Sequence, residues 1–135
     1  MSVEGRFFNW TMSAGEDLDD LTPGSGDLFK AIALDDGKPA ANGKEAGGIL
    51  IYGGKSGEHI SIGISGVMKF VAAGAVVAGA RLTVTTSGYF TTAVSGSYVV
   101  GSNLDTAVAS GAVGTGMFNF AGRSYFGVQS GGTLP

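Results

Sequence analysis

The sequence predicts an all-β protein, either a small β-barrel or a β-sandwich of short strands, with an irregular, mostly extended N-terminal region. Three observations lead to this prediction. Apolar and β-branched runs recur with turn signals about every 8–12 residues. No helical pattern of useful length interrupts residues 48–120, which argues against a parallel βαβ sheet. Glycine accounts for 25 of the 135 residues, and glycine inside strands marks the bulges and corners of a sharply curved sheet.

The strand signals strengthen from residue 48 onward, and we expect a β core over residues 48–122. Ile60, Ile62 and Ile64 alternate with serine and glycine, which is the period-two pattern of a half-buried strand. Residues 82–85 and 89–94 flank a glycine-containing turn and predict a β-hairpin. The other expected core strands are 49–52, 67–71 (continuing or pairing with the isoleucine strand), 98–100 and 113–120, the last with Phe118 and Phe120 on one face.

The segments outside this core differ in character. Residues 13–47 form an irregular acidic loop region, in which Ser13 and Glu16 fit a helix capping box, so that one short helix or a plain loop fits equally well. Residues 28–34 of this region are apolar enough for a strand. At the other end, residues 123–135 predict a C-terminal edge strand or an extended tail.

The residue inventory excludes several classes of function. The net charge is −3 and the eight basic residues are scattered, whereas nucleic-acid binding needs clustered Lys and Arg. There is no cysteine and only one histidine, His59, so metal sites and catalytic triads have almost no material. Asp105 is the only acid after Glu58, and nothing places two carboxylates on one rigid element. We therefore expect no enzymatic activity, no metal and no cofactor.

The same inventory argues against a membrane protein. The longest uncharged stretch, residues 82–104, is long enough to span a bilayer but is filled with Ser, Thr and Gly. The N-terminal residues lack the apolar run of a secretory signal. We expect synthesis in the cytoplasm and no membrane partner.

Three short patterns have a chemical interpretation and a simpler one. Gly53–Ser56 ends like a phosphate-binding loop, but that motif needs glycine where this chain has Ile49, so we favour a hairpin loop. The carboxylates of Glu16–Asp20 do not follow the calcium-loop order, and we favour a solvated acidic turn. His59 follows Glu58, and a surface histidine is favoured over a proton relay.

A cluster of large apolar side chains near the N-terminus is the candidate interface. One interpretation is a first strand that packs on the domain's own barrel. The other is an interface arm over residues 1–12 that docks on a neighbouring chain, because aromatic residues are the usual anchors of interfaces. The candidate interface residues are Arg6, Phe7, Phe8, Trp10 and Met12.

A series of glycine motifs follows the isoleucine strand. The order is Ser65-Gly66-Val67, an Ala/Gly turn, a G-x-x-L-x-V strand at residues 79–84, Ser87-Gly-Tyr89, and a V-G-x-x-L segment at residues 100–104. Over about residues 45–120 this order resembles the capsid decoration (cement) proteins of tailed bacteriophages. The chain departs from that family at Ala80-Arg81, where an acidic residue often stands.

The resemblance implies a small β-barrel or β-sandwich that is usually oligomeric, often a homotrimer. It implies a structural virion protein, made in the host cytoplasm, that binds the outer surface of the phage head over junctions between major capsid protein subunits. Such a protein catalyses nothing, stabilises the shell against internal DNA pressure and often reaches its neighbours through terminal arms. The expected partners are therefore the major capsid protein and further copies of the chain itself.

The distribution of charge fits this expectation. Residues 1–58 hold ten of the eleven acids, whereas residues 59–135 hold one acid and three bases. A surface poor in charge suits close contact, because little charge has to be desolvated on burial. Two alternatives stay open: another trimeric β-rich virion component, such as a tail or fibre segment, and a small carbohydrate- or ligand-binding β module.

Overall fold

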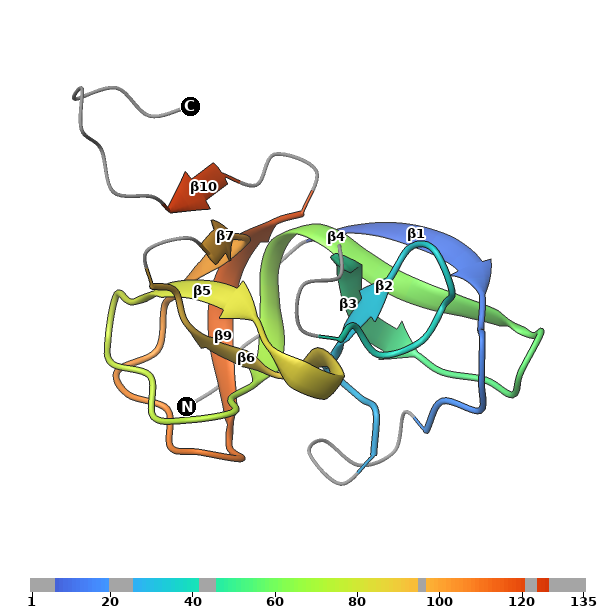
Figure 1. Ribbon diagram of the computed structural model, residues 1–135, viewed down its shortest axis with the longest axis horizontal. Helices are drawn as coiled ribbons and strands as arrows, with labels where there is room; N and C mark the ends of the chain where they lie inside the picture. Colours follow the sequence, from blue (N-terminus) through green and yellow to red (C-terminus); the bar gives the residue numbers. More distant parts are fainter. Residues whose placement is uncertain (1–6, 20–25, 42–45, 95–96, 121–123, 127–135) are drawn as a thin grey trace.

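The computed structural model describes residues 7–19, 26–41, 46–94, 97–120 and 124–126 (Figure 1). Eight of the described strands form one antiparallel sheet in the order β2-β3-β4-β9-β8-β5-β6, with β1 pairing to β4 outside this path. The sheet curls into a nearly closed barrel, and β7 and β10 form a separate two-stranded sheet. The all-β prediction is confirmed, and of the two predicted architectures the barrel is the one observed. The strands are β1 (Phe7–Ser13), β2 (Ala31–Ala33), β3 (Ala46–Tyr52), β4 (His59–Val71), β5 (Arg81–Val84), β6 (Phe90–Thr92), β7 (Ser97–Val99), β8 (Gly101–Asn103), β9 (Val113–Asn119) and β10 (Ser124–Phe126).

Several predicted strands appear with changed bounds. The isoleucine strand and residues 67–71 are one continuous strand, β4. The predicted hairpin is formed by β5 and β6 around a 3-10 turn, η1 (Thr86–Gly88), with Val84 opposite Phe90. β2 is shorter than residues 28–34, because Phe29 has a positive φ of 65° that interrupts the extended chain.

The acidic region contains no helical turn among its described residues. Residues 14–19 form a bend, and Leu18 makes an isolated antiparallel bridge with Gly54. Of the helix and the loop that the sequence allowed, the loop is observed at residues 14–19, whereas residues 20–25 and 42–45 lie outside the described part. At the other end, β10 pairs with β7 as an edge strand, and residues 127–135 also lie outside the described part.

A β-bulge in β4 allows one strand to contribute to two hydrophobic cores. Phe8 and Asn9 of β1 lie opposite Ser65 and Gly63, so Ile64 is an extra residue in β4. Because side chains alternate between faces, one extra residue reverses the alternation beyond it. Ile60 and Ile62 therefore point into a smaller core, and Met68 and Phe70 point into the barrel core, although all four have even numbers.

Four phenylalanines, Phe70, Phe90, Phe118 and Phe120, fill the barrel core. The ring of Phe118 lies 5.8 Å from that of Phe70 and 5.3 Å from that of Phe90, both edge to face, and stacks on Phe120 at 5.7 Å. Glycines on the surrounding strands make room for these rings. A Cβ at Gly116 would lie 2.7 Å from the Phe118 ring. The high glycine content is therefore explained in part by the aromatic core, because its rings need space that a Cβ on these strands would occupy.

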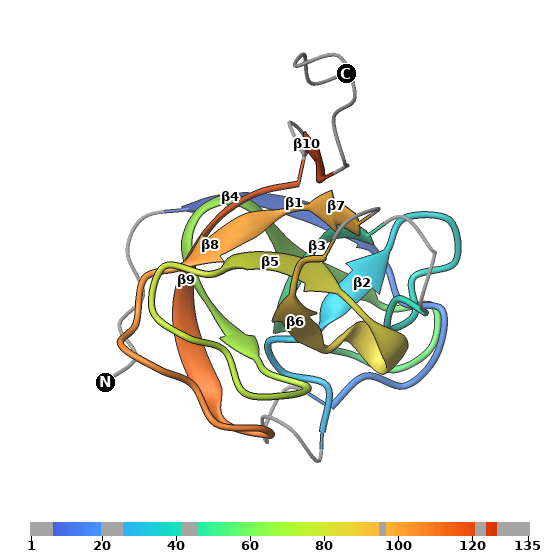
Figure 2. The same ribbon diagram turned by 60° about the vertical axis from the view of Figure 1, so that its left-hand side comes forward.

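The barrel closes between its two end strands, β2 and β6, through the η1 turn. Gly88 of η1 has a φ of +78°, and a Cβ there would lie 2.6 Å from the carbonyl oxygen of Ala31 in β2. Its N–H donates a hydrogen bond of 2.7 Å to the carbonyl of Ala40. Figure 2 shows this turn beside β2. A glycine at this position therefore permits both the backbone conformation and the close approach that join the two ends of the sheet.

Candidate interaction surface

In the described structure the N-terminal cluster belongs to β1. This strand pairs with β4 along its length, from Phe7 opposite Gly66 to Ser13 opposite His59. Arg6 and the side chains of Phe7 and Phe8 lie outside the described part. Of the two interpretations, packing on the domain's own sheet is therefore observed for residues 7–13. That this cluster binds another protein stays a prediction.

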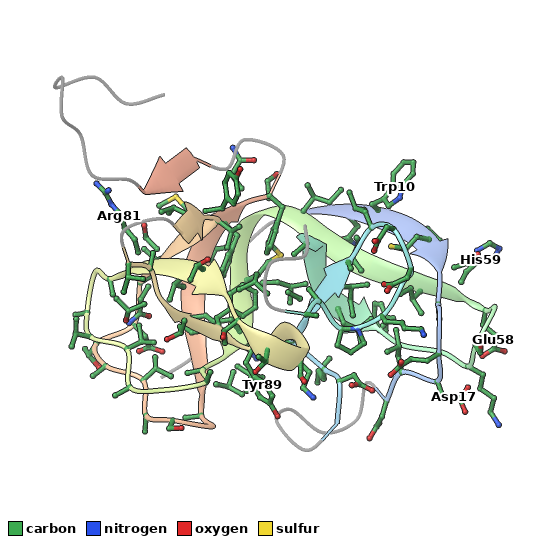
Figure 3. The ribbon with its side chains drawn as sticks, in the orientation of Figure 1. Trp10, Asp17, Glu58, His59, Arg81 and Tyr89 are labelled. Atoms are coloured by element: carbon green, nitrogen blue, oxygen red, sulfur yellow. The ribbon has the colours of Figure 1, made fainter. Side chains whose placement is uncertain are left out.

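The two candidate side chains of β1 that the structure describes are placed differently. Trp10 lies opposite Ile62 of β4, and 55% of its surface is exposed. Figure 3 shows its indole projecting away from the sheet. Met12 lies opposite Ile60 and packs against the smaller core. Met12 therefore helps to hold β1 on the domain, and Trp10 is the large apolar side chain of β1 that is exposed among those described.

A second group of exposed apolar side chains lies in the barrel half of the chain. Met117 of β9 is 54% exposed and lies opposite Val67 of β4 and Ser102 of β8. Ser102 in turn lies opposite Arg81 of β5, so these residues form one row across the outer face of four strands. The other large exposed apolar residues of this half are Val77, Val94, Tyr98 and Leu104.

Sequence reasoning missed this second group, although a signal was present. Phe118 and Phe120 were predicted to share one face of their strand, and both are buried in the barrel. The period of two then places Met117 on the opposite, outer face. Among the described residues from 60 to 120, the only charged side chains are Lys69, Arg81 and Asp105. The outer barrel face therefore exposes Met117 among residues that carry few charges.

The loop that resembles a phosphate-binding motif is held by carboxylates of the chain itself. The N–H of Lys55 donates to Glu58 Oε1 at 2.6 Å, and the N–H of Ser56 donates to Asp17 Oδ1 at 2.9 Å. Figure 3 shows Asp17 and Glu58 together at the same end of the molecule. The N–H groups that a bound phosphate would need are thus already occupied, which favours the hairpin-loop interpretation.

The acidic turn and the histidine have structural surroundings. Asp19 donates its N–H to Asp27 Oδ2 at 3.0 Å, while Asp20 lies outside the described part. His59 is exposed where β4 begins and pairs with Ser13. Within the described ranges, no three His, Cys, Asp or Glu side chains gather as a metal ion would require. No helix in those ranges is long and apolar enough to cross a membrane.

A charged cleft of about 420 Å³ lies beside this acidic region. Lys30 is buried in its wall, with Nζ 3.7 Å from Asp27 Oδ1 and 4.8 Å from the centre of the Tyr89 ring. The charge of Lys30 is therefore balanced inside the fold. The residues that line the cleft are Glu16, Asp27, Lys30, Asp36, Lys38, Pro39, Ala41 and Ser87.

The fold is a small antiparallel β-barrel that exposes Met117 on its outer face. Among solved structures, it is similar to the N base of head fiber gp8.5 of bacteriophage phi29, with a TM-score of 0.64 over 85% of this chain and 96% of that chain. The two sequences are 14% identical, so the similarity is one of fold. No protein-family model matches the chain, and no curated protein matches it in sequence.

Proposed function

We propose that this chain is a structural protein of a phage virion, which decorates the outer surface of the head and stabilises contacts between major capsid protein subunits. The observation that carries the proposal is the fold shared with the N base of the phi29 head fiber over 96% of that base. The resemblance of residues 45–120 to capsid decoration proteins supports it from the sequence. One observation rests on backbone geometry, and the other rests on the order of glycine motifs in the sequence.

The surface of the barrel supports a role in assembly. Val77 and Val94 are each about two thirds exposed, at 66% and 65%, and Met117 is 54% exposed on the outer face of β9. The centres of interfaces are depleted of charge and enriched in methionine and aromatic residues. The accessible surface is 6862 Å², and a standard interface buries about 800 Å² on each partner. One contact with a capsid subunit and one with another copy of the chain would therefore cover about a quarter of the surface.

In this proposal the protein acts by binding alone. It catalyses no reaction and needs no cofactor, and it does not contact nucleic acid or a membrane. Its partners are the major capsid protein and two further copies of itself in a homotrimer. Burial of apolar surface across subunit junctions supplies the binding energy, because that surface carries few charges that would have to lose water.

Co-sedimentation with empty heads assembled from the cognate major capsid protein tests the proposal. We expect the wild-type chain to pellet with the heads, and Met117→Glu to bind at least tenfold more weakly, because a carboxylate is then buried without a partner. Thr92→Glu, at an exposed polar position of β6, is the matched control and should bind as the wild type does. A wild-type chain that stays in the supernatant would overturn the proposal.

A second candidate role is the base of a head fibre. The specific observation in its favour is that the similar structure is itself the base of such a fibre. Electron microscopy of virions labelled with an antibody against this chain distinguishes the two roles. Label on compact density that lies flat on the shell supports decoration, and label at the foot of a projecting fibre supports the fibre base.

A further inference from the structure

β1 has the longest unpaired strand edge among the described residues. One edge of this 7-residue strand pairs with β4, and no described residue pairs with the other edge (Figure 1). The other strands at the ends of the two sheets, β2, β6, β7 and β10, have only three residues each. An unpaired edge of this length exposes a row of backbone donors and acceptors to which another strand can add.

The usual protection of a sheet edge is missing from β1. Proteins keep edge strands apart with lysine, with proline, with short length or with a bulge on the exposed strand. The sequence of β1, Phe-Phe-Asn-Trp-Thr-Met-Ser, contains neither a charged residue nor proline. The bulge of this region is the extra residue Ile64, which lies in β4 on the paired side. Among the described residues, nothing prevents a further strand from pairing with β1 along its length.

We propose that β1 pairs with β1 of a second copy of this chain, antiparallel and about a two-fold axis at Trp10. Trp10 is the central residue of Phe7–Ser13, so pairing over the full length places it opposite Trp10 of the second copy. The same register places Asn9 opposite Thr11 of the second copy. The sheets of the two copies then join into one continuous sheet.

A second copy is the occupant that the composition of β1 favours. A two-fold axis through a strand sets a charged residue near the axis against its own copy, and like charges opposite each other are destabilising. β1 has no charges, so this penalty is absent. It also brings two indoles together across the axis, each 55% exposed in the single chain, and aromatic cross-strand pairs are stabilising.

The contact is expected to be weak. One strand edge with one aromatic pair buries less than the roughly 800 Å² per partner of a standard interface, so we expect a dissociation constant of about 1–100 μM. This inference does not rest on the proposed function. It concerns the chain in solution without capsids, and if the chain forms a trimer through another surface, the β1 pair joins two trimers.

Single cysteines test the register, because the chain has none of its own. Directly opposite residues of an antiparallel pair have Cα atoms about 4.5–5.5 Å apart, within the range of a disulfide. We expect oxidised Trp10→Cys to form a covalent dimer, and mixed Asn9→Cys and Thr11→Cys to cross-link more than either alone. Tyr52→Cys, at a 65% exposed position of β3 and outside the proposed contact, is the control.

Opposite charges test the two-fold axis. We expect Trp10→Lys and Trp10→Glu each to lower the weight-average mass in sedimentation at about 100 μM to that of the unpaired form, and an equimolar mixture to restore the wild-type mass. Equal masses for the wild type and Trp10→Lys would overturn the inference. So would a mixture that keeps the lower mass, or Tyr52→Cys cross-linking as well as Trp10→Cys. Circular dichroism of each variant confirms that the fold is retained.

Discussion

The barrel core and the smaller core, which meet along β4, fill their space in different ways. Aromatic rings whose centres lie 5.3–6.3 Å apart fill the barrel, against strands that carry glycine. The smaller core contains only aliphatic side chains and Met12, and part of its cover is the loop that carries Ala14 and Leu18. The barrel therefore depends on the fit between rings and glycines, whereas the smaller core depends on how firmly a loop is held.

The surfaces over the two cores also differ in how their polar and apolar groups are placed. The loops beside the smaller core carry carboxylates that bind backbone N–H groups of their own chain, as Asp17 does with Ser56. The outer barrel face exposes Met117 and other apolar groups and has few charges. One region thus satisfies its polar groups internally, and the other leaves large apolar side chains exposed. The following variants test this division, from the largest expected effect to the smallest.

Removing one ring from the barrel core should have the largest effect. Phe118 contacts the rings of Phe70, Phe90 and Phe120, so Phe118→Ala should lower the free energy of unfolding by about 3–5 kcal/mol. Urea unfolding followed by circular dichroism measures this loss. Met117→Ala, one residue away on the exposed face, should change it by less than about 0.5 kcal/mol. Equal losses for the two variants would contradict the assignment of faces in β9.

Adding one methyl group at a glycine tests the fit between rings and glycines. A Cβ at Gly114 would lie 2.5 Å from Val108 Cγ2 and 2.8 Å from Phe70 Cζ, so Gly114→Ala should destabilise the protein by about 1–3 kcal/mol. Gly74 has open space around the same position and no positive φ, so Gly74→Ala should stabilise by about 0.4–1 kcal/mol. Thermal unfolding measures both, and the comparison fails if the two changes have the same sign.

Releasing the loop beside the smaller core should have the smallest and most local effect. Asp17→Ala removes the acceptor of the Ser56 N–H, which should cost at most about 1 kcal/mol. Hydrogen exchange should show the Ser56 amide exchanging faster, with amides of the barrel strand β9 unchanged. Glu16→Ala, one residue earlier at an exposed position, is the control. Faster exchange in β9 would show that opening of the loop also opens the barrel, which would contradict the division between the two regions.

The sequence predicted those parts of the barrel that depend on local alternation. The Phe118 and Phe120 pair and the hairpin of β5 and β6 follow from period two and from turn residues. The sequence could not predict the bulge at Ile64. The apolar residues of β4 have even numbers on both sides of it, so the alternating pattern shows no break. Only the register of β1 against Ser65 and Gly63 reveals the extra residue. The start of β2 at Ala31 was missed because Phe29 has a positive φ, a conformation that is rare for a phenylalanine and that its residue type does not predict.

The sequence indicates which residues could form an interface, but it does not decide whether they form an extended arm or a strand. Aromatic residues near a terminus indicate a contact surface, and Trp10 is exposed as such a surface requires. Whether these residues form an arm or a strand depends on a free edge of β4, which is about fifty residues away in the sequence. Short-range patterns carry no information about such a pairing.

The position of β4 between its neighbours determines how the molecule bears tension. β1 pairs with residues 59–66 of β4, and β3 and β9 pair in turn with residues 61–63 and 65–71. A pull along β1 therefore acts on ladder hydrogen bonds that lie perpendicular to the force and are strained together rather than one after another. The load then divides between β3 and β9, on the two sides of the bulge. The same strand that joins two cores is thus the path along which force crosses the molecule.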